Sequence, residues 1–256
     1  MKIALVGAGN VASHIARALG QRLAAVVSRN AGHASAIAPD GVPAGSYDLL
    51  ERVRPDKIII SVADHAVDLV VEAIGRLDYD PIVVHTSGTV PKEALAPVSP
   101  RTGVLYPLQT FSAAAHVDLS AVPFFTEAAL DDDLAVIDDV ARLMSEHVYH
   151  ADAARRRVLH VAGVFTSNFT NVLMESVQHI LGEAGYDLGV VDPLLHATVD
   201  KLFAIGPHDA QTGPARRGDF AVIERQYSSL PEDLRPVYRT LTDLILKYQG
   251  ISNEQN

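Results

Sequence analysis

A glycine-rich turn between an apolar run and a helical pattern is the feature that most constrains this chain. The run Ile3-Ala4-Leu5-Val6 leads into the turn, and residues 13–19 then show helical periodicity, with Gly20 placed to end the helix. Small residues in the turn allow a tight bend, approach of a pyrophosphate to the backbone and close packing of helix on strand. Phosphates would bind at the positive end of this helix. A chance glycine turn is the alternative to a dinucleotide site, for which we expect the binding residues Gly7, Ala8, Gly9, Asn10 and Val11.

The composition is globular and limits the classes of partner. The chain has 256 residues, 48% hydrophobic and 20% charged, with a net charge of −10. This charge disfavours nucleic acid and anionic membranes as partners. The absence of cysteine excludes disulfides, thiolate zinc sites and cysteine nucleophiles, and the dispersed histidines predict no metal site. Because no apolar stretch has the length of a membrane span, we expect a cytoplasmic protein.

The first 150 residues alternate short β-like runs with helical segments, which is typical of a mostly parallel, doubly wound sheet. The segment between Asn30 and Lys57 is rich in Ala, Gly and Pro, so the third strand should be short or irregular. The remaining strands are expected at residues 2–6, 23–27, 57–62, 82–85, 103–106 and 122–126. Helices are expected at residues 10–19, 65–76 and 131–145.

After Asp152 the pattern becomes helical throughout. Residues 154–184 predict one long helix whose apolar positions exceed a single stripe, and further helices are expected at residues 190–205 and 234–248. We therefore expect two domains, a dinucleotide-binding domain over residues 1–151 and an all-α domain over residues 152–256. A small helical domain with a wide apolar face predicts a homodimer formed through that domain.

The end of the second strand bears on the choice of cofactor. The strand over residues 23–27 leads into Ser28, Arg29 and Asn30, and no carboxylate is present there to bind the ribose hydroxyls of NAD. These three side chains suit a 2′-phosphate, so NADP is the predicted cofactor, although Arg29 would also be ordinary as a solvated loop residue.

The nicotinamide end should lie at the carboxyl ends of the next two strands. There we expect Asp64 to cap a helix, whereas His85 is either buried structure or a proton donor. The small and hydroxyl residues expected to contact the cofactor at these ends are Val62, Ala63, Thr86, Ser87 and Gly88.

Several motifs spread over the chain resemble one known family. They are Gly7-Ala8-Gly9-Asn10-Val11-Ala12, His85-Thr86-Ser87-Gly88-Thr89, Tyr106-Pro107-Leu108-Gln109-Thr110-Phe111-Ser112, Ser167-Asn168-Phe169 and Thr212-Gly213-Pro214-Ala215-Arg216-Arg217-Gly218-Asp219. The chain resembles the bacterial Rossmann-like NADP oxidoreductases with a helical C-terminal domain of unknown function. The resemblance implies a Rossmann fold followed by an all-α domain like the C-terminal domain of 6-phosphogluconate dehydrogenase. Its remote relatives are pyrroline-5-carboxylate reductase, ketopantoate reductase, prephenate dehydrogenase and the β-hydroxyacid dehydrogenases.

The resemblance also implies where the acid/base residues should lie. In the β-hydroxyacid and ketopantoate branches, a lysine on the first long helix precedes an asparagine by four residues. Asn168 fits the asparagine, but Val164 stands at the lysine position and cannot donate a proton. His160, Ser167 and Asn168 share one side of the helix and are the catalytic candidates, with His160 as proton carrier. A histidine packed on an apolar helix is the alternative.

Substrate contacts and a basic run complete the candidates. The loop over residues 206–219 either binds a carboxylate or only links helices, with Asp219 as the next N-cap. The substrate candidates are Tyr106, Gln109, Lys201, Thr212 and Arg216. The run Arg155-Arg156-Arg157 is expected to be a solvated face or to pair with Asp131-Asp132-Asp133.

Two functions follow from these observations. The first is an NADP-dependent oxidoreductase that transfers hydride to a small carbonyl or imine substrate bearing a carboxylate. The second is a catalytically inactive NADP-binding sensor or structural dimer, because fold alone does not fix function.

Overall fold

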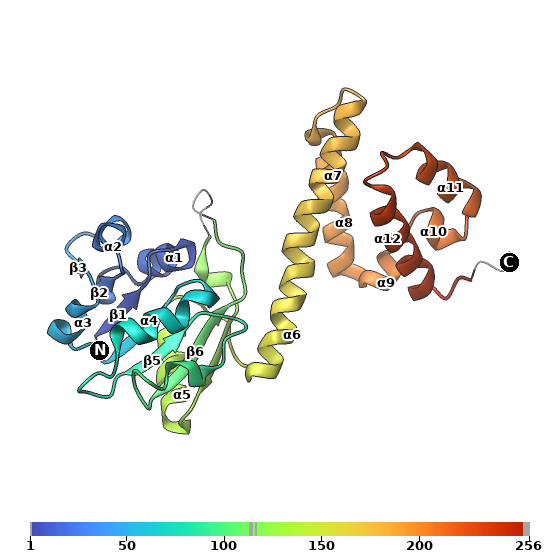
Figure 1. The fold of residues 1–256 in the computed structure, drawn as a ribbon. Coiled ribbons are helices and arrows are strands. Elements are labelled where there is room, and N and C mark those ends of the chain that lie inside the picture. The colour runs from blue at the N-terminus through green and yellow to red at the C-terminus, as the bar shows by residue number, and fades with distance from the viewer. Residues whose placement is uncertain (1, 113–114, 116, 253–256) are drawn as a thin grey trace. The chain divides into compact units, whose positions relative to one another are not determined.

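The computed structural model describes residues 2–112, 115 and 117–252 and divides the chain into two compact units. The first unit comprises Met1–Ser167 and the second Asn168–Asn256. In Figure 1 the first unit contains all the strands, and the second consists of helices and their connections.

The first unit is built on one eight-stranded sheet with the order β3-β2-β1-β4-β5-β6-β7-β8. Neighbouring strands run parallel except β6 and β7, which are antiparallel. The strand order reverses between β1 and β4, where an open sheet leaves a crevice at the strands' carboxyl ends. The strands are β1 (Ile3–Val6), β2 (Leu23–Val27), β3 (Ala44–Gly45), β4 (Lys57–Ile60), β5 (Ile82–His85), β6 (Thr102–Pro107), β7 (Phe124–Ala128) and β8 (Val148–His150).

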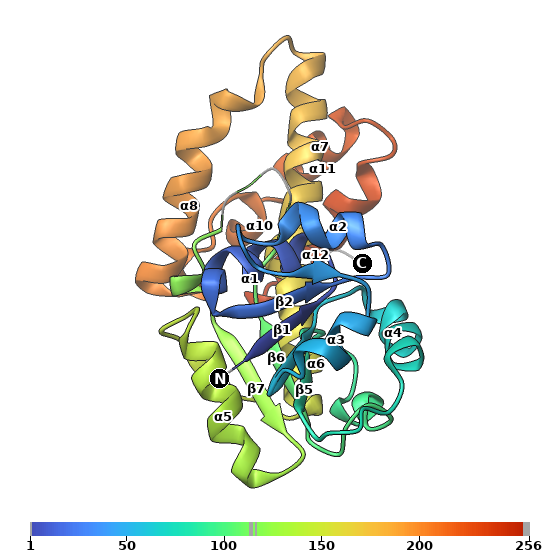
Figure 2. The ribbon, with the colours of Figure 1, turned by 90° about the vertical axis from the view of Figure 1, so that its left-hand side faces the viewer.

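Helices cover both faces of this sheet, as Figure 2 shows for α4 and α5. Successive side chains of a strand point to opposite faces, so Ile3 and Leu5 belong to one core cluster and Ala4 and Val6 to the other. One face is covered by α1 (Asn10–Leu19), α2 (Ala31–Ile37) and α5 (Asp131–Arg142), and the opposite face by α3 (Asp48–Val53) and α4 (Val67–Ile74). The predicted Rossmann fold is confirmed.

Short 3₁₀ helices lie in several connections and explain part of the difference from the predicted bounds. The helix expected at residues 65–76 is a 3₁₀ turn, η2, followed by the shorter α4. The third strand is short as predicted, whereas β8 was missed because three residues carry little periodic signal. The 3₁₀ helices are η1 (Gly20–Arg22), η2 (Asp64–Ala66), η3 (Lys92–Leu95), η4 (Leu119–Ala121) and η6 (Leu188–Val191).

The long predicted helix is interrupted by a π-helical segment. It consists of α6 (Ala153–Gly163), the π segment Val164–Phe169 and α7 (Thr170–Glu183). Asp152 caps α6, where its side chain accepts a hydrogen bond of 2.8 Å from the Arg155 N–H. The expected domain boundary coincides with the start of α6, while the compact units divide between Ser167 and Asn168. The two positions differ because α6 packs against the first unit.

The second unit has almost no core of its own. Among its described residues, only Ala210, Ala215, Ile223 and Thr242 are buried. Large apolar side chains are exposed instead, of which Phe203 is 89% exposed. None of the described helices combines the length and apolar character needed to cross a bilayer. After α7 the helices are α8 (Asp192–Ile205), α9 (Pro207–Ala210), α10 (Pro214–Arg217), α11 (Phe220–Ser229) and α12 (Arg235–Tyr248).

Candidate cofactor and proton-transfer site

The two glycines of the N-terminal turn differ in what surrounds them. Gly7 has φ +116°, and a Cβ there would lie 2.1 Å from the Ser61 carbonyl oxygen, so no other residue fits between β1 and β4. Gly9 caps α1, and a Cβ there would meet no protein atom within 4 Å. The first turn of α1 carries no acidic side chain. The protein itself therefore requires Gly7, while the free space at Gly9 suits an anion at the helix N-terminus.

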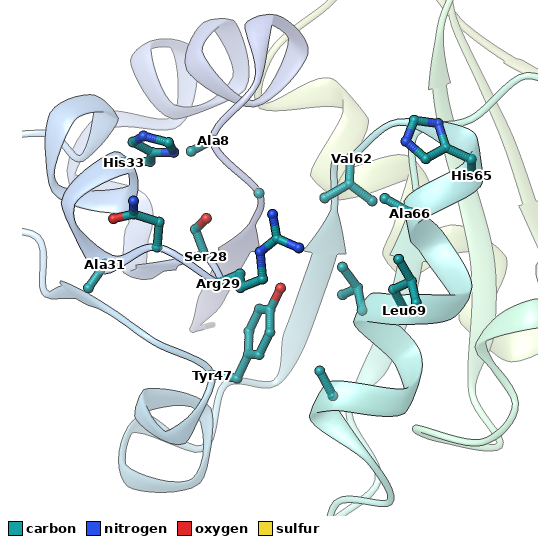
Figure 3. Close-up of a pocket in the computed structure, with 14 residues that line it drawn as sticks. Ala8, Ser28, Arg29, Ala31, His33, Tyr47, Val62, His65, Ala66 and Leu69 are labelled. Carbon is teal, nitrogen blue, oxygen red and sulfur yellow. The ribbon is translucent and has the colours of Figure 1, made fainter.

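A cavity of about 710 Å³ opens beside this turn, between β2 and α4 (Figure 3). On the β2 side, Ser28 and Arg29 line it, and the Arg29 side chain extends toward the α4 side. Asn30 also lines it, but its side-chain oxygen caps α2 by accepting a 2.9 Å hydrogen bond from the Gly32 N–H. Three polar groups thus meet in the region where a 2′-phosphate would be bound.

Several cavity residues were missed by the sequence analysis, and four of them have large side chains. His33 lies on α2 and Tyr47 directly precedes α3, and both line the cavity, Tyr47 beside Arg29 and His33 near Ala8. Burial raises the pKa of the Tyr47 hydroxyl. The opposite wall is formed by α4 and the turn before it, with His65 and the apolar Leu69. The sequence carried no signal for these residues, because their place on the cavity depends on how α2, α3 and α4 pack on the sheet.

Other predicted cofactor residues lie outside this cavity. The Asn10 side-chain amide donates to the Phe111 carbonyl at 3.2 Å, and Val11 packs against the core. Ala63 caps η2 through its backbone. Of the predicted set, Gly7, Ala8, Ser28, Arg29, Asn30 and Val62 line the cavity.

The turns after β4 and β5 lie side by side, as predicted. The Thr86 hydroxyl donates to the Ser61 hydroxyl at 3.2 Å. The Ser87 hydroxyl accepts from the backbone N–H groups of Thr89 and Val90, each at 3.0 Å. Ser87 therefore shapes the turn around Gly88.

The expected capping role of Asp64 is wrong. No side chain caps η2, and the Asp64 carboxylate instead accepts a hydrogen bond from the Thr89 hydroxyl. The β4 and β5 turns are thereby joined, because the tertiary partner offers a stronger interaction than a local amide.

Gly88 lies directly beneath a tyrosine and histidine pair. The Tyr106 hydroxyl is 3.2 Å from His160 Nδ1, and a Cβ on Gly88 would lie 2.9 Å from both that nitrogen and the Tyr106 Cζ. Tyr106 comes from β6 and His160 from α6. Burial, and secondly the Asp64 charge, raise the pKa of Tyr106, so its phenol keeps its proton. Two proton-carrying groups therefore meet at the carboxyl end of β5, where only glycine leaves room for them.

The remaining residues predicted on the long helix lie further along it. The Ser167 hydroxyl is 2.6 Å from the Thr110 hydroxyl, which follows β6. Asn168 is exposed within the π segment. The Gln109 side chain accepts a 2.7 Å hydrogen bond from the Thr110 N–H. Of the three catalytic candidates, only His160 joins the pair beside Gly88.

His85 is buried beneath the Gly88 turn and is neutral at physiological pH. Its Nδ1 accepts a hydrogen bond of 3.2 Å from the Ser87 N–H. Burial, followed by the charge of Arg156, lowers the pKa of His85 from 6.5 to about 4. Nε2 has no hydrogen-bond partner of normal geometry among the described residues. The nearby Pro91 carbonyl favours the protonated ring, but this effect is smaller than the lowering of the pKa by burial. Of the two predicted roles, buried structure fits this environment.

This environment predicts a pH-dependent stability. Unfolded chains bind a proton at His85 below pH 6.5, but the folded chain does so only below about 4, so acidification favours unfolding. The free energy of unfolding should fall by about 3 kcal/mol from this group as the pH falls through that interval. His85→Asn keeps an acceptor and removes the titration. Urea unfolding at pH 7 and pH 4 should show the smaller pH dependence in the variant, and equal dependence in both proteins would contradict the assignment.

Arg156 departs from the expectation for the basic run. It is 0% exposed, and its guanidinium pairs with Glu127 on β7 rather than with the acidic run at residues 131–133. Asp133 pairs instead with Arg101. The neighbouring Arg155 and Arg157 are exposed. Periodicity could not distinguish Arg156, because a buried arginine is permitted only by a partner distant in sequence.

The second unit brings two substrate candidates together. Lys201 and Thr212 line one cavity of about 270 Å³. Arg216 is exposed on α10 and does not line it. Asp219 accepts a 3.2 Å hydrogen bond from the Val222 N–H and caps α11, as the linking role predicts. Among the described residues, no group of acidic and histidine side chains is arranged to hold a metal ion.

Comparisons with known proteins agree with this architecture. A family model described as a domain of unknown function (DUF2520) matches residues 122–245. A Bacteroides fragilis protein named as a putative NADP oxidoreductase is 32% identical, with 96% of this chain and 98% of that chain covered and a TM-score of 0.81. No curated protein matches.

Two more distant structures share the fold. A Thermotoga maritima protein, TM1727, is 20% identical with a TM-score of 0.81, covering 97% of this chain and 99% of that one. A Plasmodium falciparum pyrroline carboxylate reductase with NADP bound is 10% identical with a TM-score of 0.61, covering 97% and 98%. Because the Bacteroides fragilis protein is similar along nearly its whole length, the chain belongs to the family of Rossmann-like proteins with a helical C-terminal domain of unknown function.

Proposed function

We propose that this protein is an NADP-dependent reductase that transfers hydride to a small carbonyl or imine substrate. The observation that carries the proposal is the Tyr106–His160 pair above Gly88, at the crevice end of the sheet. A hydride transfer of this kind needs a bound cofactor and a proton donor beside the reacting atom. The cavity beside Gly7 and this pair supply the two requirements in one unit.

The residues present fit an NADP molecule. The open backbone at Gly9 and the N-terminus of α1 suit the pyrophosphate. Arg29, Ser28 and His33 offer donors for a 2′-phosphate, and Leu69 offers an apolar surface for the adenine. When bound, the cofactor supplies the hydride, and the turns at Ser61 and Gly88 provide the surface for its nicotinamide end.

The protein's own contribution to the reaction is the proton. Tyr106 keeps its hydroxyl proton and donates it to the substrate oxygen or nitrogen as negative charge develops there. His160, at 3.2 Å, then returns a proton to the phenol. This arrangement replaces the lysine of the β-hydroxyacid dehydrogenases, whose position Val164 occupies.

A cofactor titration and a substrate screen test the proposal. NADPH should bind more tightly than NADH when each is titrated against the protein by fluorescence. A set of small keto acids, imino acids and their uncharged analogues is then assayed for NADPH oxidation. If neither NADPH nor NADH binds below millimolar concentration, the proposed function is excluded. If NADH binds more tightly than NADPH, NADP is excluded as the cofactor.

Arg29 provides a sharper test of the cofactor preference. Arg29→Ala should weaken NADPH binding by about 10- to 100-fold, the range expected for loss of hydrogen bonds to a charged group, and leave NADH binding unchanged. Arg52→Ala, which removes another exposed arginine of the first unit, is the matched control. Equal losses for NADPH and NADH would mean that Arg29 does not contact the 2′-phosphate.

We also propose that the protein forms a homodimer through its second unit. The described part of that unit buries few side chains, so it needs further apolar contact to be stable. The exposed apolar residues on α8 and α12, including Phe203 and Leu241, provide a surface for a second copy. Sedimentation equilibrium should give the mass of two chains, and Phe203→Asp should shift it toward one. A monomer at micromolar concentration would refute the proposal.

A further inference from the structure

We propose that Arg156 is a positioning residue that sets the contact between His160 and Tyr106. The proposal rests on the proposed function only in taking that pair as the proton-transfer groups. Arg156 does not touch the pair itself. It lies on α6, which carries His160, and it binds the turn that carries Gly88 and β7, the strand paired with the one that carries Tyr106.

The guanidinium is fully enclosed, and its two terminal nitrogens donate to specific acceptors, while Nε has no hydrogen-bond partner among the described residues. One terminal nitrogen pairs with the Glu127 carboxylate and also donates to the Ala151 carbonyl at 3.4 Å. The other donates to the Val90 carbonyl at 3.0 Å. Burying a charge this completely is costly unless such partners hold it. The position of α6 is therefore tied to these acceptors.

Two of the acceptors, Glu127 and Val90, connect Arg156 to the segments that form the site. Glu127 lies on β7 opposite Val104 of β6, and Tyr106 follows two residues later on β6. Val90 follows Gly88 by two residues in the same turn. His160 is four residues after Arg156 and thus on the same side of α6. A single side chain consequently joins the helix, the strand pair and the turn.

Glu127 is itself held from a second direction. Its other carboxylate oxygen is 2.5 Å from Lys92 Nζ, and Lys92 also pairs with Glu93 at 3.0 Å. The hydrogen bond to Glu127 raises the pKa of Lys92. With one oxygen on each cation, the carboxylate has little freedom to turn, so it gives Arg156 a fixed partner.

The planar guanidinium fork explains why an arginine is used here. An apolar side chain fills space without fixing a direction. An ammonium group has no rigid plane from which two hydrogen bonds diverge to separate acceptors. The fork fixes the distance and angle of α6 over the turn. Displacement of a reacting group by about 1 Å is enough to cost on the order of 10²-fold in rate.

The test observes His160 directly and needs no substrate. Nitrogen NMR of ¹⁵N-histidine-labelled full chain, with His160→Gln to identify the signal, reports the His160 ring. Tyr106→Phe provides the signal expected when the contact is lost. In Arg156→Met the His160 signal should move to the Tyr106→Phe position, whereas Arg157→Met, an exposed arginine on the same helix, should leave it unchanged. An unchanged signal in folded Arg156→Met would overturn the proposal.

Two milder variants answer the case in which Arg156→Met does not fold. Arg156→Lys keeps the charge without the fork, and Glu127→Gln keeps the shape of its partner without the charge. Both should lose the wild-type His160 signal at least in part, and a wild-type signal in both would overturn the proposal. If the signals behave as expected but no NADPH binds, the proposed function fails while the positioning role stands. Where a substrate is found, Arg156→Lys should lower kcat about 10²-fold without altering NADPH affinity.

Discussion

Gly7→Ala is expected to leave the first unit unable to fold stably. A Cβ at this position would lie 2.1 Å from a main-chain oxygen of the neighbouring strand, and the backbone has φ +116°, which alanine rarely adopts. Separating β1 from β4 would open the centre of the sheet. The loss should be roughly 4 kcal/mol or more, a large fraction of a typical domain's stability. Urea unfolding followed by circular dichroism measures it.

Gly9→Ala is the matched control for that experiment. Gly9 has φ −83°, which alanine adopts readily, and a Cβ there meets no protein atom. This variant should unfold at nearly the wild-type urea concentration but bind NADPH about 10-fold or more weakly, because the methyl group occupies the space assigned to the pyrophosphate. A Gly9→Ala protein that binds NADPH normally would show that the cofactor does not approach this turn.

Tyr106→Phe and His160→Gln should each lower kcat by roughly 10²- to 10⁴-fold, the range for loss of a positioned proton-transfer group. NADPH affinity should remain unchanged, because both side chains act at the reacting end of the site. The double variant should be little worse than the poorer single variant, since the two groups act as a unit. The measurement is steady-state NADPH oxidation with the best substrate from the screen.

Tyr149→Phe is the control for the loss of a phenol hydroxyl. Tyr149 is half-exposed on β8, and its ring stacks on Phe125. Phe125 also neighbours the Tyr106 ring, so both tyrosines contact the same aromatic side chain. This variant should retain the wild-type rate. Strictly additive losses in the Tyr106 and His160 double variant would instead assign the two residues to separate steps.

The sequence contained enough information for the fold because its signals are local. The order of strand, glycine turn and helix at Gly7 requires only neighbouring residues, and the buried strands are continuous apolar runs. The position of Ser28 and Arg29 followed from the same reasoning, since both stand at a fixed place relative to β2. Both residues line the cavity.

The contact between Tyr106 and His160 could not be predicted in this way. His160 was recognised as a candidate by its place on the helix, but nothing in the sequence relates it to Tyr106, 54 residues earlier. Their contact depends on the packing of α6 on the sheet, which Arg156 and Glu127 determine across 29 residues. The π segment at Val164 was likewise missed, because its backbone hydrogen bonds leave no periodic signature in the sequence.

The outermost strands of the sheet also determine how copies of this chain can meet. An exposed edge strand offers unpaired backbone groups to another chain, and long edges promote fibrous association. Here the sheet ends in β3, with two residues, and β8, with three. Such short edges give an incoming strand almost no ladder to extend. The two short edges therefore disfavour edge-to-edge aggregation between copies of this chain.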